Sequence, residues 1–172
     1  RTFDHYPEAG GVFTAERDLG TDDTPLPRVH SKRSPGRFFT TEGMLRIDTR
    51  VGAGRPAVVQ RRWVEELGGF DETIGCAIDC ELWIRYSFHV PLVLQPEPLV
   101  LRRFHPSNLS DNRMQDAEDW IRILQKIATD HPEFVERHGP VYRLCMARNA
   151  LRYGRELLAR GGGSGTLEEA RQ

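Results

Sequence analysis

The segments Gly68-Gly69-Phe70-Asp71-Glu72 and Ile78-Asp79-Cys80-Glu81-Leu82-Trp83-Ile84-Arg85 are separated by only five residues. The two glycines follow a helical run from Arg61 to Leu67 and predict a left-handed end to that helix, where glycine fits without strain. Apolar residues then recur at helical spacing, so a second helix is expected with one face toward a core. Asp79 falls in the first turn of this second helix, where the positive end of the helix dipole favours a carboxylate. Such a carboxylate is well placed to act as a catalytic base.

Three further segments accompany this stretch in a fixed order. The chain opens with His5–Phe13 (HYPEAGGVF), Ala57–Arg62 (AVVQRR) precedes the glycine turn, and Leu101–Ser107 (LRRFHPS) follows the acidic helix. Taken together, the segments resemble the acceptor half of an inverting family-2 glycosyltransferase. In that family, a strand ending in arginine leads into a helix, Gly-Gly-Phe-Asp-Glu and an acidic helix follow, and a strand then runs into Arg-x-His. The similarity covers residues 3–110.

The resemblance implies an α/β fold, namely a partial GT-A (nucleotide-diphospho-sugar transferase) fold in residues 1–110. It also implies that a nucleotide-binding half with a metal-binding Asp-x-Asp motif precedes Arg1, so that the chain is a fragment and inactive by itself. After Ser110 the apolar residues recur at helical spacing, which predicts a helical extension over residues 111–160. The glycine-rich start of residues 161–172 is typical of a flexible tail.

Shorter patterns predict the strands of the first part. Gly11–Ala15 is expected to form a short strand, and the polar residues Glu16–Arg37 a long loop near the active-site rim. Pro91–Gln95 and Leu99–Phe104 predict two strands, which the prolines between them separate.

The implied activity is transfer of a sugar from a nucleotide-diphosphate sugar to an acceptor hydroxyl, with inversion. A single displacement of this kind needs a base that takes the proton of the attacking hydroxyl. The resemblance assigns this role to Asp79. Ile78 stands where the family usually has glutamate. The alternative for Asp79 is an ordinary acidic residue at the start of a helix.

The resemblance implies further contacts with the acceptor. Glu81 is expected either to bind the acceptor sugar or to pair with Arg85, its neighbour one helical turn later. Asp71 and Glu72 are expected to shape the acceptor pocket, or only to cap the backbone of their turn. Phe70 is expected in the core.

The second strand ends in residues suited to the donor. Arg102 or Arg103 is expected to neutralise the leaving diphosphate, because a guanidinium matches phosphate oxygens in a forked geometry. His105 is implied as a ligand of Mn²⁺ or Mg²⁺, or as a contact of the diphosphate, with the main metal ligands in the preceding half. Asp22 and Asp23 lie in turn sequence and predict a solvated loop rather than a metal site.

Composition limits the classes of protein to which the chain can belong. The 172 residues include 24 Lys and Arg against 25 Asp and Glu, a net charge of −1 that offers no argument for nucleic acid. No apolar run reaches the roughly 18 residues of a membrane span, and three cysteines predict reduced thiols in the cytoplasm.

The acceptor class is left open between a saccharide and a lipid-linked molecule. The second of these would place the protein peripherally at the inner face of the membrane. No sequence feature specifies an oligomeric state. The alternative function is a non-catalytic protein-interaction module that binds through the helical half after Ser110.

Overall fold

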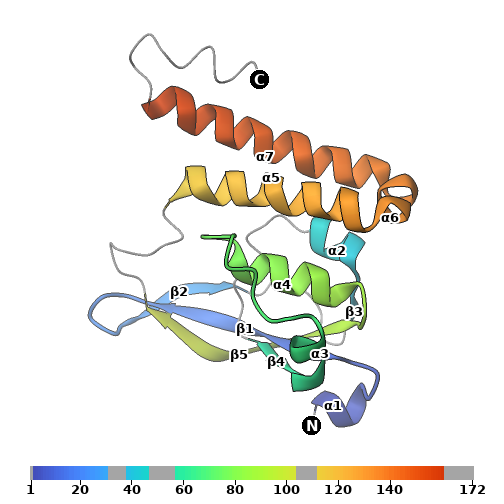
Figure 1. Cartoon of the computed structure of the whole chain (residues 1–172). Helices are drawn as coiled ribbons and strands as arrows, with labels where there is room; N and C mark the ends of the chain where they lie inside the picture. The colour runs from blue at the N-terminus through green and yellow to red at the C-terminus, as the bar shows by residue number, and fades with distance from the viewer. Residues whose placement is uncertain (1, 31–37, 47–56, 104–111, 161–172) are drawn as a thin grey trace. The chain divides into compact units, whose positions relative to one another are not determined.

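A computed structural model describes residues 2–30, 38–46, 57–103 and 112–160 (Figure 1). The described residues form two compact units. The first contains those within Arg1–Asp71 and Ile78–Asn108, and the second those within Glu72–Ala77 and Leu109–Gln172. The fold is mixed α/β, with a mostly antiparallel sheet followed by C-terminal helices, which confirms the predicted class.

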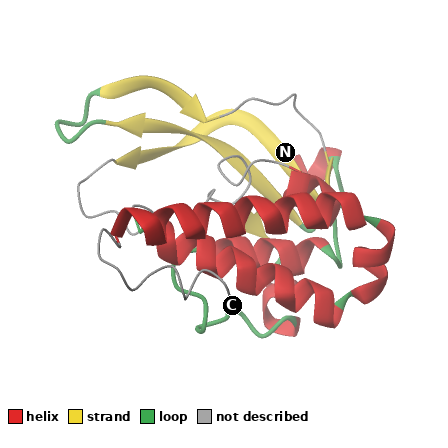
Figure 2. Ribbon diagram, turned by 90° about the horizontal axis from the view of Figure 1, so that it is seen from above, coloured by secondary structure: helices red, strands yellow, loops and turns green. Residues whose placement is uncertain are grey.

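The first unit is built around β1 (Gly11–Leu19), which has a neighbour on each side. The long strand β5 (Leu92–Arg103) runs parallel to it along its whole length. The other side of β1 pairs antiparallel with β4 (Ala57–Val59) near its start and with β2 (Pro25–His30) near its end. The two-residue strand β3 (Phe38–Phe39) pairs antiparallel with the start of β5. The strands are yellow in Figure 2.

Two strand predictions were wrong. The long loop expected over Glu16–Arg37 is not found up to His30, because β1 continues to Leu19 and β2 follows over Pro25–His30 after a short turn. The two strands expected around the prolines are one strand, β5. Its register with β1 shifts on either side of Ala15, which lies opposite Pro98, and such an irregularity lets a strand accept proline.

The glycine turn and the acidic helix form as predicted. Helix α3 (Arg61–Glu66) ends in Gly68 and Gly69, whose φ angles are 76° and 75°. The Gly69 N–H donates to the carbonyl of Val64 at 2.9 Å. Helix α4 (Ile78–Ser87) follows.

Helix α4 buries one face against β1. The Trp83 ring meets the Phe13 ring edge-on, with 5.5 Å between the ring centroids. The Tyr86 hydroxyl donates to the carbonyl of Gly10 at 2.8 Å. Two shorter helices complete this unit, α1 (Thr2–His5) and α2 (Thr41–Arg46).

The second unit is helical. Helix α5 (Arg113–Asp130), the short α6 (Pro132–Arg137) and α7 (Gly139–Arg160) follow one another, and α5 and α7 lie side by side (Figures 1 and 2). Among the apolar residues that recur at helical spacing in α5, five are buried and three are half-buried. The buried ones are Ala117, Trp120, Ile123, Leu124 and Ile127, and the half-buried ones are Met114, Ile121 and Ala128. Pro132 opens α6 at a position where its missing N–H costs no helical hydrogen bond.

Within the described part of the chain, no helix combines the length and apolar character needed to cross a membrane.

Candidate functional site

Asp79 occupies the second position of α4, as its spacing predicted. Its side chain is half-buried, and Oδ1 accepts a hydrogen bond from the N–H of Cys80 at 2.8 Å. The backbone therefore orients the carboxylate at the helix start. A carboxylate that is held in place and partly open to solvent can accept a proton from a bound hydroxyl.

Glu81 and Arg85 form a two-pronged ion pair on the same helix. Arg85 Nε donates to Glu81 Oε1 at 3.0 Å, and Arg85 Nη2 donates to Glu81 Oε2 at 2.7 Å. Glu81 is only 3% exposed. Of the two roles predicted for Glu81, the pair with Arg85 is the one present, and paired N–H donors of this kind fix geometry as well as adding energy.

The same guanidinium also holds the glycine turn. Arg85 Nη2 donates to the carbonyl of Gly69 at 2.8 Å, and Nη1 donates to the carbonyl of Leu67. Carbonyls at the end of a helix lack hydrogen-bond donors within the helix, and here Arg85 of α4 supplies the donors for the end of α3. Arg85 thus ties the turn before Phe70 to the helix that carries Asp79. The sequence shows Arg85 as a partner of Glu81 but carries no signal for this second contact.

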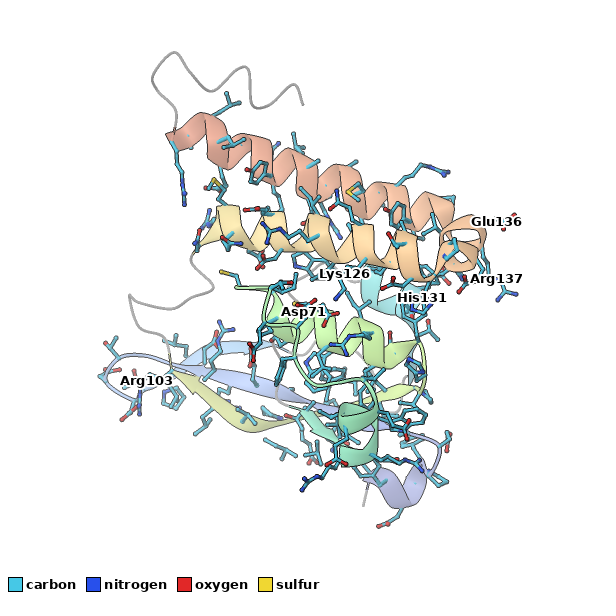
Figure 3. All side chains as sticks on the ribbon, in the orientation of Figure 1. Asp71, Arg103, Lys126, His131, Glu136 and Arg137 are labelled. Atoms are coloured by element: carbon cyan, nitrogen blue, oxygen red, sulfur yellow. The ribbon has the colours of Figure 1, made fainter. Side chains whose placement is uncertain are left out.

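The residues after the glycines are accessible. Phe70 is 52% exposed, so the expectation that it lies in the core was wrong. Asp71 is half-buried in the loop ahead of α4 (Figure 3), and Glu72 is exposed. The division between the two units falls between Asp71 and Glu72. The two acids therefore belong to different units, although they are adjacent in sequence.

Arg102 pairs with two acidic residues of β1. Arg102 Nη1 lies 3.3 Å from Glu16 Oε1, and Arg102 Nε lies 3.4 Å from Asp18 Oδ1. Glu16 and Asp18 are 5% and 1% exposed. The alternation Glu16-Arg17-Asp18 is the signal that could have predicted a strand here, because every second residue of a strand shares one face.

Arg103 pairs elsewhere. It lies at the end of β5 (Figure 3), and its Nε donates to Asp23 Oδ1 at 2.8 Å. Asp23 belongs to the turn between β1 and β2. In the same turn, the hydroxyl and the N–H of Thr24 bind Asp22 and hold the pKa of its carboxyl below its usual value. Both acids are exposed, in agreement with the predicted turn chemistry.

No metal site is found among the described residues, in the sense that no three His, Cys, Asp or Glu side chains gather in a suitable group. The predicted metal ligand, His105, lies outside the described residues.

A carboxylate of α5 binds the segment that leads into α4. Asp119 is completely buried, and its Oδ2 accepts hydrogen bonds from three consecutive amides: those of Gly75 at 3.0 Å, Cys76 at 2.6 Å and Ala77 at 3.2 Å. Its Oδ1 accepts from the side-chain amide of Gln115 at 2.9 Å. The backbone directly before Ile78 is therefore fixed by a residue that no local pattern associates with it.

The same surroundings shift the pKa of the Cys76 thiol, which lies in this segment. Burial raises the pKa of Cys76, and the carboxylates of Asp119 and Asp116 raise it further. Cys76 is consequently a weak nucleophile, because the thiolate is the reactive form.

A search of known protein families finds no family model that matches this chain, and a search of curated proteins finds no match.

Proposed function

We propose that this chain is the acceptor-side part of an inverting glycosyltransferase of the GT-A type, with Asp79 as the catalytic base. The observation that carries the proposal is the position of Asp79 in the first turn of α4, two residues after the backbone segment that Asp119 binds. The Arg85 contacts to the glycine turn support it further, because they join the turn before Phe70 to the helix that carries Asp79. A base must be held within hydrogen-bonding reach of its proton, which these contacts favour.

The proposed step is one displacement. The acceptor hydroxyl oxygen attacks the anomeric carbon, the bond from that carbon to the nucleotide diphosphate breaks, and the hydroxyl proton moves to the carboxylate of Asp79. The products are the inverted glycoside and the nucleoside diphosphate. The resemblance also implies a divalent metal ion, which would stabilise the departing diphosphate and for which His105 is one expected ligand.

The exposed turn suits an acceptor sugar. Phe70 presents an aromatic ring to solvent, and the apolar face of a pyranose can stack on such a ring. Asp71 follows it directly and offers a carboxylate to sugar hydroxyls. Glu81 is assigned a structural role, since its carboxylate is buried in the pair with Arg85.

The two arginines at the end of β5 could bind the donor diphosphate only by giving up an existing ion pair. Arg102 and Arg103 are engaged with acidic residues of β1 and of the following turn. We propose that a diphosphate would compete with these carboxylates for one guanidinium, so donor binding would break an existing ion pair.

The test uses the natural polypeptide that carries these residues, a panel of nucleotide sugars and simple acceptors. Asp79→Asn keeps the size of the side chain but cannot take a proton, so kcat should fall by about 10²- to 10⁴-fold with donor affinity unchanged. Asp130→Asn, at an exposed carboxylate, is the matched control and should transfer sugar normally. The anomeric configuration of the product, read by NMR, should be inverted. A near-normal kcat in Asp79→Asn would show that Asp79 is not the catalytic base.

A second candidate is a non-catalytic interaction module. The observation that favours it is a row of exposed leucines on α7, at positions 144, 151 and 158. Absence of sugar transfer for every nucleotide sugar in the panel, with a partner still bound through α7, would favour this candidate.

A further inference from the structure

Three leucines of α7 face solvent in one row. Leu144, Leu151 and Leu158 are 68%, 56% and 59% exposed. They recur every seven residues, which is close to two helical turns, so they follow nearly the same line along the helix. Single exposed leucines are common on protein surfaces, whereas a heptad row of them is typical of a helix that packs against another helix.

Small residues lie beside this row. Ala147 and Gly154 follow the first two leucines by three residues, at the spacing that completes a helix–helix seam. Ala147 is exposed, and a methyl group added to Gly154 would meet no atom within 4 Å. We call the five residues Leu144, Ala147, Leu151, Gly154 and Leu158 the leucine seam. Its small members would let the backbone of a partner helix approach closely.

Positive charge surrounds the leucine seam. Helix α7 carries a single acid, Glu156, against five arginines at positions 143, 148, 152, 155 and 160. Arg152 is paired with Asp116 of α5. Arg143 and Arg155 are exposed. Arg143 lies one residue before Leu144, and Arg155 lies four residues after Leu151. These are the flanking positions that select a partner by charge in paired helices.

The flanking charge argues against a second copy as the partner. In a parallel pair, Arg143 of one copy would face Arg148 of the other, and in an antiparallel pair Arg148 would face Arg155. Like charges placed opposite one another weaken association. A membrane surface is also a poorer fit, because helices that lie in a bilayer interface present a broad apolar face rather than a single row.

We propose that the leucine seam of α7 binds an amphipathic helix of another polypeptide, one whose own apolar row is flanked by aspartate or glutamate. This inference is independent of the proposed sugar transfer, because it rests on α7 alone. Leucines would interdigitate across the seam, and the flanking arginines would pair with the partner's carboxylates.

The test measures binding of a labelled synthetic helix by fluorescence anisotropy, with the whole 172-residue chain. The probe has about three heptads, with leucine and alanine in its apolar row and glutamate at the flanks. A second peptide with lysine in place of every glutamate is the control. We expect the glutamate peptide to bind at least about 10-fold more tightly, and to bind more weakly as salt rises.

Variants of the protein locate the site. Leu151→Gln should weaken binding of the glutamate peptide by about 10-fold or more, since a central seam residue is lost. Arg155→Glu should weaken it and reduce its salt dependence. Leu99→Gln is the matched control, because Leu99 is 63% exposed but lies on β5. The urea midpoint of Leu151→Gln should equal that of the unaltered chain, which separates lost binding from lost folding.

Four outcomes would overturn the proposal. They are equal binding of the two peptides, unchanged binding by Leu151→Gln, dimers of the chain in sedimentation that Leu151→Gln dissociates, and binding to anionic phosphatidylserine vesicles without binding to the peptide.

Discussion

Replacing Asp119 by alanine should destabilise the second unit strongly, because one buried carboxylate serves three backbone amides. A hydrogen bond from a backbone N–H to a carboxylate contributes about 1.5–3 kcal/mol, and a buried donor left without an acceptor adds a penalty of its own. Three such bonds of 2.6–3.2 Å are lost at once. Since they share one oxygen they are not additive, and we expect a loss of about 3–5 kcal/mol in the free energy of unfolding.

The matched substitutions isolate the cause. Asp119→Asn keeps one acceptor oxygen for the three amides, and its new NH2 group can donate to the side-chain oxygen of Gln115 once the Gln115 amide flips, so it should cost only about 1–2 kcal/mol. Asp130→Ala removes an exposed carboxylate from the end of the same helix and should change the free energy of unfolding by less than about 0.5 kcal/mol.

Two measurements check this order. Urea denaturation gives the free energies of unfolding, and amide hydrogen exchange reads the three donors themselves. In Asp119→Ala the amides of Gly75, Cys76 and Ala77 should exchange about 100-fold faster, as a loss of about 3 kcal/mol requires. If the alanine variant loses less than about 1 kcal/mol and these amides keep their protection, another acceptor serves them and the reasoning fails.

Three further predictions concern the first unit and the thiol. Arg85→Met removes the ion pair with the buried carboxylate of Glu81, and urea denaturation should show a loss of about 3–5 kcal/mol in the free energy of unfolding; a loss below about 1 kcal/mol would contradict this. Burial raises the pKa of Tyr86, so the folded state keeps this proton while the unfolded chain releases it above about pH 10. Stability should therefore fall as pH rises beyond that value, and Tyr86→Phe should make the fall shallower; equal slopes would contradict the assignment. Alkylation of Cys76 by iodoacetamide should show a pH midpoint above the usual value of about 8.5 for a free cysteine, and a midpoint at or below it would contradict the raised pKa.

Local rules account for the parts of the fold that were predicted. The end of α3 follows from two adjacent glycines, whose positive φ angles other residues adopt only at a cost. The buried apolar residues of α5 follow from its helical period. Each of these signals lies within a few residues of the structure it predicts.

The parts that were missed depend on distant partners. The charges of Glu16 and Asp18 favoured a loop, and their ion pairs with Arg102, more than 80 residues later, have no local signal. The contact of Arg85 with the carbonyl of Gly69 and that of Asp119 with the amides before α4 are also absent from any local pattern. The position of Asp79 was predicted, because it follows from helix spacing alone, whereas the contacts that fix its surroundings were not.

The long separation between Asp119 and its three amides has a consequence for synthesis of the chain. Asp119 follows Ala77 by 42 residues. At about 5–20 residues per second, the ribosome needs about 2–8 s to add them. During this interval the segment before α4 has been made but its acceptor has not. A nascent chain stalled between these two points should therefore leave the amides of residues 75–77 without the carboxylate that binds them in the folded chain.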